Sequence, residues 1–160
     1  MSQCPCGSKK DDKDCCEIYI NGHQFPATPE ALMRSRYTAY TLANINYIKK
    51  TMCGTPLTDF DEMDALRWAK HINWIGLCVL KTWTESAEKG YVEFIATFID
   101  RHQLKKMHEI SEFIYQDSQW LYYNGVTIEP TKPTKQKISR HTPCPCGNER
   151  KFKNCHGKQE

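Results

Sequence analysis

After Cys4-Pro5-Cys6-Gly7, the adjacent pair Cys15-Cys16 follows, with eight residues between Cys6 and Cys15. The same pattern returns 140 positions later as Cys144-Pro145-Cys146-Gly147 and Cys155-His156. Each copy therefore supplies four sulfur or imidazole groups with the spacing C-x-C-x8-C-[C/H]. A single C-x-C would be weak evidence, but two quartets that share the proline and the glycine are a strong signal. We expect these two terminal segments to organise the rest of the chain.

The ligand types indicate the metal and its role. Four cysteines, or three cysteines and a histidine, hold tetrahedral zinc in structural sites. Pro5 and Pro145 each fix one dihedral of a sharp turn, and Gly7 and Gly147 let the chain fold back. We expect the second ligand pair to sit at the end of a short helix. Because protein groups fill all four positions, the sites are predicted to be structural rather than catalytic.

A disulfide framework is the alternative interpretation of nine cysteines. The odd count disfavours it, as does the adjacent pair Cys15 and Cys16, since neighbours rarely bridge each other. Met1-Ser2-Gln3 has no signal-peptide features, and no window approaches the length of a membrane span. We therefore expect a cytoplasmic protein that binds two zinc ions. Cys53 and Cys78 match no motif and are expected to be small buried hydrophobic residues.

The chain length leaves room for one ordinary domain between two small modules. Residues 1–20 and 141–160 are too few to bury a core, so their folding free energy is expected to come largely from the ions. Residues 25–130 are long enough for a core of their own. Residues 131–140 are rich in Lys and Thr and are expected to form a linker.

The formal net charge of +3 is unevenly distributed. Lys132–Glu160 contains eight basic and two acidic residues, a formal charge of +6, which leaves −3 for the remainder. A basic tail of this size can contact an acidic protein face, an anionic phospholipid surface or RNA. A solvated surface is the more common meaning, and Phe152 is the one stacking aromatic interleaved with the charges.

The central segment is expected to begin with two helices. Thr28-Pro29-Glu30 supplies an N-cap, a proline at the first helical position and an acidic residue near the positive end of the helix dipole. This helix is expected to continue to about Met52. A second helix is expected from Asp59 to Ile72, with Asp59 and Glu62 spaced as a capping box.

Four strands are expected after the helices. Residues 74–83 are almost continuously apolar, as in a strand buried on both faces. Residues 91–100 alternate, and one face of this strand would carry Val92, Phe94, Ala96 and Phe98. A charged connection at 101–106 leads to strands at 107–116 and 119–124, joined by an Asp117-Ser118 turn.

Short connections between these strands imply an antiparallel meander. The predicted fold class is therefore α+β, with helices packed on a curved antiparallel sheet and small zinc-binding modules at both termini.

Several segments resemble known proteins. The Cys-Pro-Cys-Gly quartet resembles the SEC-C motif, the zinc-binding tail of the SecA preprotein translocase motor and of many otherwise unrelated proteins. Leu32–Tyr40, Trp74–Leu77, Val92–Phe94 and His108–Phe113 further resemble the bacterial YchJ family of SEC-C-containing proteins. The resemblance spans nearly the whole chain. It implies a central domain of the nuclear-transport-factor-2-like, or cystatin-like, fold, a cone with a pocket.

The resemblance implies the positions of metal ligands, but it implies no biochemical activity. The metal ligands that it implies are Cys4, Cys6, Cys15, Cys16, Cys144, Cys146, Cys155 and His156. One departure from the motif is at Lys9 and Lys10, where SEC-C sequences often have glycine after Ser8. We expect a less flexible loop there, with every ligand retained.

Two classes of function remain open. The first is a zinc-binding interaction or adaptor protein whose modules contact a protein or an anionic partner. The second, less favoured, is an enzyme or small-ligand binder with a pocket lined by Arg36, Tyr37, Glu93 and His108. Arg36 lies among aromatic residues, where it either makes structural pairing or stacking contacts or binds an anion. His108 and Glu109 are adjacent on a strand, so at most one of them lines a given pocket.

Overall fold

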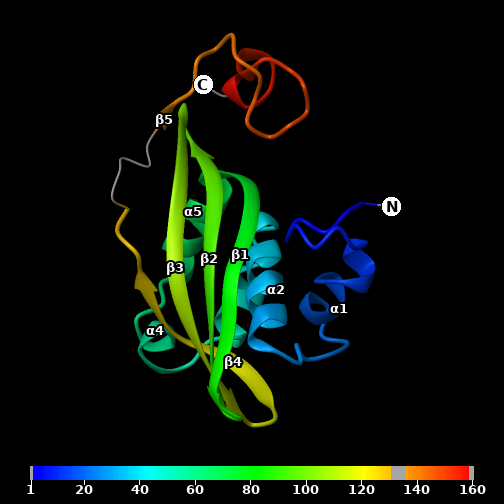
Figure 1. Cartoon of the computed structure of the whole chain (residues 1–160), viewed down its shortest axis with the longest axis vertical. Helices are drawn as coiled ribbons and strands as arrows, with labels where there is room; N and C mark the ends of the chain where they lie inside the picture. Colours follow the sequence, from blue (N-terminus) through cyan, green and yellow to red (C-terminus); the bar gives the residue numbers. More distant parts are fainter. Residues whose placement is uncertain (1, 131–135, 159–160) are drawn as a thin grey trace.

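The computed structural model describes residues 2–130 and 136–158, so the expected linker at 131–140 lies partly outside the described residues. Its sheet is an antiparallel meander with the strand order β1-β2-β3-β4. The strands are β1 (Asn73–Ser86), β2 (Lys89–Asp100), β3 (Gln103–Gln116) and β4 (Gln119–Thr127). A two-residue strand, β5 (Gln136–Lys137), pairs with the beginning of β3. The predicted α+β class with a curved antiparallel sheet is confirmed (Figure 1).

Five short α-helices and three 3-10 turns complete the described chain. The helices are α1 (Glu17–Ile20), α2 (Pro29–Thr41), α3 (Ile45–Lys50), α4 (Gly54–Thr58) and α5 (Glu62–His71). The 3-10 turns are η1 (Asp12–Asp14), η2 (Phe152–Asn154) and η3 (His156–Lys158). Within the described ranges, no helix has the length and apolarity needed to span a membrane.

Helix α2 is the central element of the fold. It begins as predicted, because Thr28 Oγ1 accepts a hydrogen bond from the Ala31 N–H at 3.1 Å. The sheet lies on one side of α2, and the N-terminal segment with α1 lies on another (Figure 1). Because neighbours cover several of its faces, even polar residues such as Ser35 and Thr38 are fully buried.

The long helix predicted to reach Met52 is broken. Ala43 has a left-handed φ of 53°. Asn44 then caps a new helix, α3, by accepting a hydrogen bond from the Tyr47 N–H at 3.1 Å. The break directs α3 back toward α2, where the Tyr47 hydroxyl lies 2.7 Å from Ser35 Oγ. Good N-capping by Asn is the local reason for a new start at this position.

The second helix begins later than predicted. Its N-cap is Asp61, whose carboxylate accepts a hydrogen bond from the Asp64 N–H at 3.0 Å. Asp59 instead ends the short helix α4, so it does not form the predicted capping box with Glu62.

Strand β1 is not buried on both faces as predicted. It is an edge strand, and its residues are half-buried or exposed, with Leu80 48 % exposed. The prediction of burial is also wrong for Cys78, which is exposed, and Cys53 is only half-buried. The alternation in β2 is confirmed, since one face carries the buried residues Val92, Phe94, Ala96 and Phe98.

Strands β3 and β4 are longer than predicted. The expected connection at 101–106 shrinks to a two-residue turn, Arg101-His102, and β3 starts at Gln103. The turn at Asp117-Ser118 is confirmed, and both residues have positive φ, as a type I′ hairpin turn requires.

Candidate metal centres

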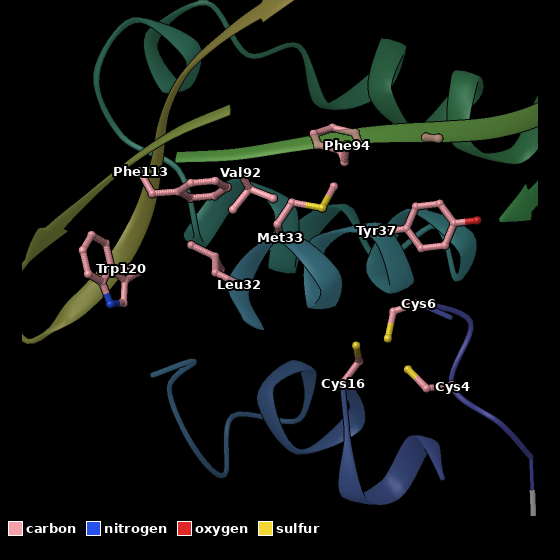
Figure 2. Close-up of a cluster of buried hydrophobic side chains, with 11 residues drawn as sticks. Cys4, Cys6, Cys16, Leu32, Met33, Tyr37, Val92, Phe94, Phe113 and Trp120 are labelled. Carbon is pink, nitrogen blue, oxygen red and sulfur yellow. The ribbon is translucent and has the colours of Figure 1, made fainter. Parts of the chain in front are cut away.

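The first quartet forms a compact cluster of thiols. One sulfur atom from each of Cys4, Cys6, Cys15 and Cys16 lies within 4.8 Å of every other. Figure 2 shows Cys4, Cys6 and Cys16 directing their sulfur atoms toward one another beside α2. These three residues are at most 4 % exposed and belong to the same core cluster as Leu32 and Met33.

Local backbone geometry explains why the spacing brings the sulfurs together. Gly7 has a φ of 79°, and its N–H donates to Cys4 O at 3.2 Å, which closes the turn between the first two ligands. The Cys4 N–H donates to Lys10 O at 2.8 Å and brings the loop back. The turn η1 then delivers Cys15, whose N–H donates to Asp12 O at 3.0 Å. The predicted short helix before the second ligand pair is therefore present as a 3-10 turn.

The second quartet repeats this geometry bond for bond. Gly147 has a φ of 81° and donates to Cys144 O at 3.2 Å. The Cys144 N–H donates to Arg150 O at 2.8 Å, and the Cys155 N–H donates to Phe152 O at 3.0 Å. Two segments with little sequence in common outside the motif thus adopt one conformation, which shows that the motif residues dictate it.

The donor sets fit a tetrahedral metal ion. A tetrahedron with metal–sulfur bonds of about 2.3 Å has edges of about 3.8 Å. The Cys6–Cys15 and Cys15–Cys16 sulfur pairs are 3.6 and 3.9 Å apart. In the second cluster, the sulfurs of Cys146 and Cys155 are 3.6 Å apart.

The imidazole of His156 completes the second set. Its Nδ1 lies 3.2 Å from Cys144 Sγ and 3.4 Å from Cys155 Sγ. These edges are shorter, as expected for a ligand that binds through nitrogen. Both clusters can therefore hold a metal ion with all four positions filled by the chain.

Electrostatics of the first cluster favour a bound cation. A hydrogen bond from Cys16 lowers the pKa of Cys6, whereas the same hydrogen bond and burial raise the pKa of Cys16. Burial also raises the pKa of Cys4, to about 12. The pKa values of Cys6 and Cys16 thus move in opposite directions through their shared hydrogen bond. A cation at the centre removes this conflict, because it stabilises several thiolates at once.

Arg34 attaches the first module to the central domain. Its Nη1 donates to Cys6 O at 2.8 Å, and its Nε donates to Glu30 at 3.1 Å. The Thr38 hydroxyl lies 3.7 Å from Cys4 Sγ. Neither of these two α2 residues was assigned a role from the sequence. Both residues lie away from the face of α2 that carries Met33, Tyr37 and Tyr40 toward the cavity. Their positions are the signal that a second layer covers this helix.

The loop residue after Ser8 is strained in this chain. Lys9 has a φ of 66°, and Glu149, at the equivalent position of the second module, has a φ of 64°. Both residues therefore occupy a left-handed conformation that glycine adopts without a Cβ clash. A glycine at this position would therefore remove the strain.

We expect Lys9→Gly to raise the free energy of unfolding by about 0.5–1 kcal/mol, because relief of the strain exceeds the extra backbone entropy that glycine loses on folding. Thermal unfolding of the metal-loaded protein measures the change. Lys10→Gly is the matched control, since Lys10 is not among the residues with positive φ and glycine there is expected to destabilise. Equal effects of the two substitutions would contradict the strain argument.

A cavity of about 300 Å³ lies between the helices and the sheet. Arg36 and Tyr37, two of the predicted pocket residues, line it. Glu93 and His108 do not line it. Instead, His108 Nε2 lies 2.8 Å from Glu93 Oε1. The reason is strand alternation, because Phe94 and Glu109 face the cavity and their neighbours Glu93 and His108 point to the other face of the sheet.

Comparisons with known proteins match both parts of the chain. Residues 28–125 match the family described as YchJ, middle NTF2-like domain, and residues 142–158 match the SEC-C motif. The UPF0225 protein GSU1048 of Geobacter sulfurreducens is 41 % identical over 156 residues, covering 96 % of this chain and 97 % of the relative. A UPF0225 protein of Serratia proteamaculans is 38 % identical over 165 residues, with 97 % of each chain covered.

Two solved structures are also similar. The solution structure of a SEC-C motif containing protein from Rhodopseudomonas palustris has a TM-score of 0.74 and 34 % identity, covering 80 % of this chain and 100 % of that chain. The crystal structure of a SEC-C motif containing protein from Psychrobacter arcticus has a TM-score of 0.66 and 30 % identity. The match covers 99 % of this chain and 97 % of that chain. The chain therefore belongs to the YchJ-like family of SEC-C motif-containing proteins.

Proposed function

We propose that both quartets bind zinc and that the protein is an interaction module whose C-terminal zinc site presents a basic surface to an acidic protein partner. The observation that carries this proposal is the different setting of the two clusters. Cys4, Cys6 and Cys16 lie in the main core, whereas Cys146, Cys155 and His156 are only partly buried. In this proposal residues 1–20 stabilise the central domain and residues 141–158 contact the partner.

Zinc is favoured over other metals by the donor set. Cysteine thiolates and imidazole are its usual ligands in closed tetrahedral sites. Such thiolates persist in a reducing compartment, and we therefore place the protein in the cytoplasm.

The surface of the second module carries the charge expected for an acidic partner. Arg150, Lys151 and Lys158 are exposed around the cluster. A pocket that His156 helps to line is also lined by Arg101, His102 and Arg140. The end of the sheet and the module thus contribute to one basic surface. The first module differs, because Asp11, Asp12, Asp14 and Glu17 offset its lysines.

Reversing two of these charges tests the proposal. We expect the double variant Arg150→Glu, Lys151→Glu to weaken capture of the partner by about tenfold or more, because like charges would face each other across the interface. Its zinc content should stay at two equivalents, since neither side chain is a ligand. Pull-down from cell extract at two salt concentrations, with elemental analysis of the bait, makes the measurement.

A matched control reverses Lys10 and Lys13, which are exposed on the first module. This control should capture the partner as well as the unaltered protein does. Capture that depends on RNA, or binding to anionic vesicles without any protein partner, would refute the proposal of an acidic protein.

A further inference from the structure

The cavity beneath α2 has a mostly aromatic wall and belongs to neither metal cluster. Its volume of about 300 Å³ is at the lower end of the range for small-molecule sites. The aromatic rings come from helices, strands and the connection between α4 and α5: Tyr37, Tyr40, Phe60, Trp68, Trp74 and Phe94. Three polar groups at this cavity hold hydrogen-bonding capacity that the chain itself does not use.

Arg36 is the first of these groups. It is only 7 % exposed, and its guanidinium lies over the Tyr122 ring at 4.7 Å. Nη1 donates to Ile48 O at 2.8 Å and to Thr51 Oγ1 at 2.7 Å. Within residues 2–130 and 136–158, these are the hydrogen bonds of this side chain. The edge formed by Nε and Nη2 is therefore available, and this edge can bind a carboxylate through two parallel hydrogen bonds.

Trp74 is the second group. Its indole Nε1 is buried and has no hydrogen-bond partner in the part of the chain that the structure describes. An indole N–H can only donate, so this atom calls for an acceptor. Buried donors are normally paired. Trp74 lines the cavity, so a small movement of its ring would expose this unpaired N–H to an acceptor on a ligand.

Glu109 is the third group. Its Oε1 accepts hydrogen bonds from Ser111 Oγ at 2.7 Å and from the Tyr122 hydroxyl at 3.1 Å. Among the described residues, Oε2 accepts none, so it can receive a donor from the cavity. Gly125 leaves the space for this arrangement, because a Cβ there would collide with Glu109 and with the Tyr122 hydroxyl.

The two opposite charges do not neutralise each other directly. Burial lowers the pKa of Arg36, and Glu109 opposes this only weakly. No N–O distance of 4.0 Å or less joins the two described side chains. A purely anionic ligand would be repelled by Glu109, and a purely cationic ligand by Arg36. A molecule that carries both charges satisfies both residues.

We propose that this cavity binds a small amino carboxylate, a zwitterion of amino-acid size with an apolar or aromatic side chain. The ligand carboxylate binds the free edge of Arg36, and its ammonium group donates to Glu109. Trp74 Nε1 supplies a further donor, and the side chain packs among the aromatic rings. This site goes beyond the proposed function, which resides in the zinc modules.

Three probes of similar size separate the contributions. We expect L-phenylalanine to bind the intact zinc-loaded protein and to change the fluorescence of Trp68 and Trp74. Phenylpropionate lacks the ammonium group and phenethylamine lacks the carboxylate. Each is expected to bind about tenfold more weakly, as loss of one charge-assisted hydrogen bond implies.

The variant Glu109→Gln keeps the shape of the side chain and removes its charge. It should lower the affinity for L-phenylalanine about tenfold while leaving that for phenylpropionate unchanged or improved. Glu93→Gln, on the other face of the sheet, is the control and should change neither affinity. Circular dichroism confirms that each variant is folded.

The proposal is overturned if the three probes bind equally well, or if Glu109→Gln weakens phenylpropionate as much as L-phenylalanine. It is also overturned if the folded protein binds none of the proteinogenic amino acids at concentrations up to about 10 mM, where complexes with Kd near 1 mM would be well occupied.

Discussion

Replacing Cys6 by serine is expected to lower the free energy of unfolding of the whole protein by more than about 4 kcal/mol, the range reached when a structural metal is lost. Cys6 is fully buried, and it shares a core cluster with Leu32, Met33 and Tyr37. Loss of the ion would therefore loosen the layer that covers α2. Elemental analysis should find one zinc equivalent in place of two, and thermal unfolding should show a transition at a much lower temperature.

The matched control is Cys146→Ser at the equivalent position of the second module. This variant should also lose one zinc equivalent, but the main unfolding transition should move little, because its cluster lies outside the core around α2. Cys78→Ser, at an exposed position on β1, should change neither property. If Cys6→Ser and Cys146→Ser destabilised the main transition equally, the different roles assigned to the two clusters would be wrong.

The metal clusters were predictable from sequence because their geometry is local. Within each module, every ligand lies within thirteen residues of the others, and proline and glycine fix the turn between them. The break at Ala43 was not predictable in this way, since apolar residues at Tyr40, Tyr47 and Ile48 continue at helical spacing through it. Only Asn44, a favourable N-cap residue, indicated a new helix start, and its effect depends on contacts between α3 and α2.

The cavity residues on α2 were predictable from the sequence. Those on β3 were not, because they depend on which face of the strand points inward. Arg36 and Tyr37 followed from the sequence, because they share one face of the predicted helix with Met33 and Tyr40. Choosing between His108 and Glu109 required knowing whether the odd-numbered or the even-numbered residues of β3 face inward. The sequence contained a signal for this choice. Met107 and Phe113 are apolar and have the same parity as Glu109, so that face was the better candidate for the inside. The apolar run of β1 led to the wrong prediction that this strand is buried on both faces. Hydrophobicity alone does not show whether a strand lies at the edge of a sheet.

Phe152→Ala is expected to release the second module from the sheet while leaving its zinc in place. Phe152 is fully buried and packs with Ile99 and Ile138, and its ring meets His102 edge-on at 5.7 Å between centroids. Truncating a buried Phe costs about 3–5 kcal/mol, here mostly in the docking of the module. Hydrogen exchange should increase across 138–158, whereas the zinc content should stay at two equivalents because no ligand changes.

Phe25→Ala is the control for the loss of an aromatic ring. Because Phe25 is 65 % exposed, this substitution should not change hydrogen exchange in either module. The first module has Asp12 at the position equivalent to Phe152, so it lacks this aromatic anchor and docks instead through its buried cysteines and Arg34. The two modules thus share a metal-binding conformation and differ in how they attach. Loss of zinc from Phe152→Ala would contradict this division, because it would mean that the second cluster needs the sheet to form.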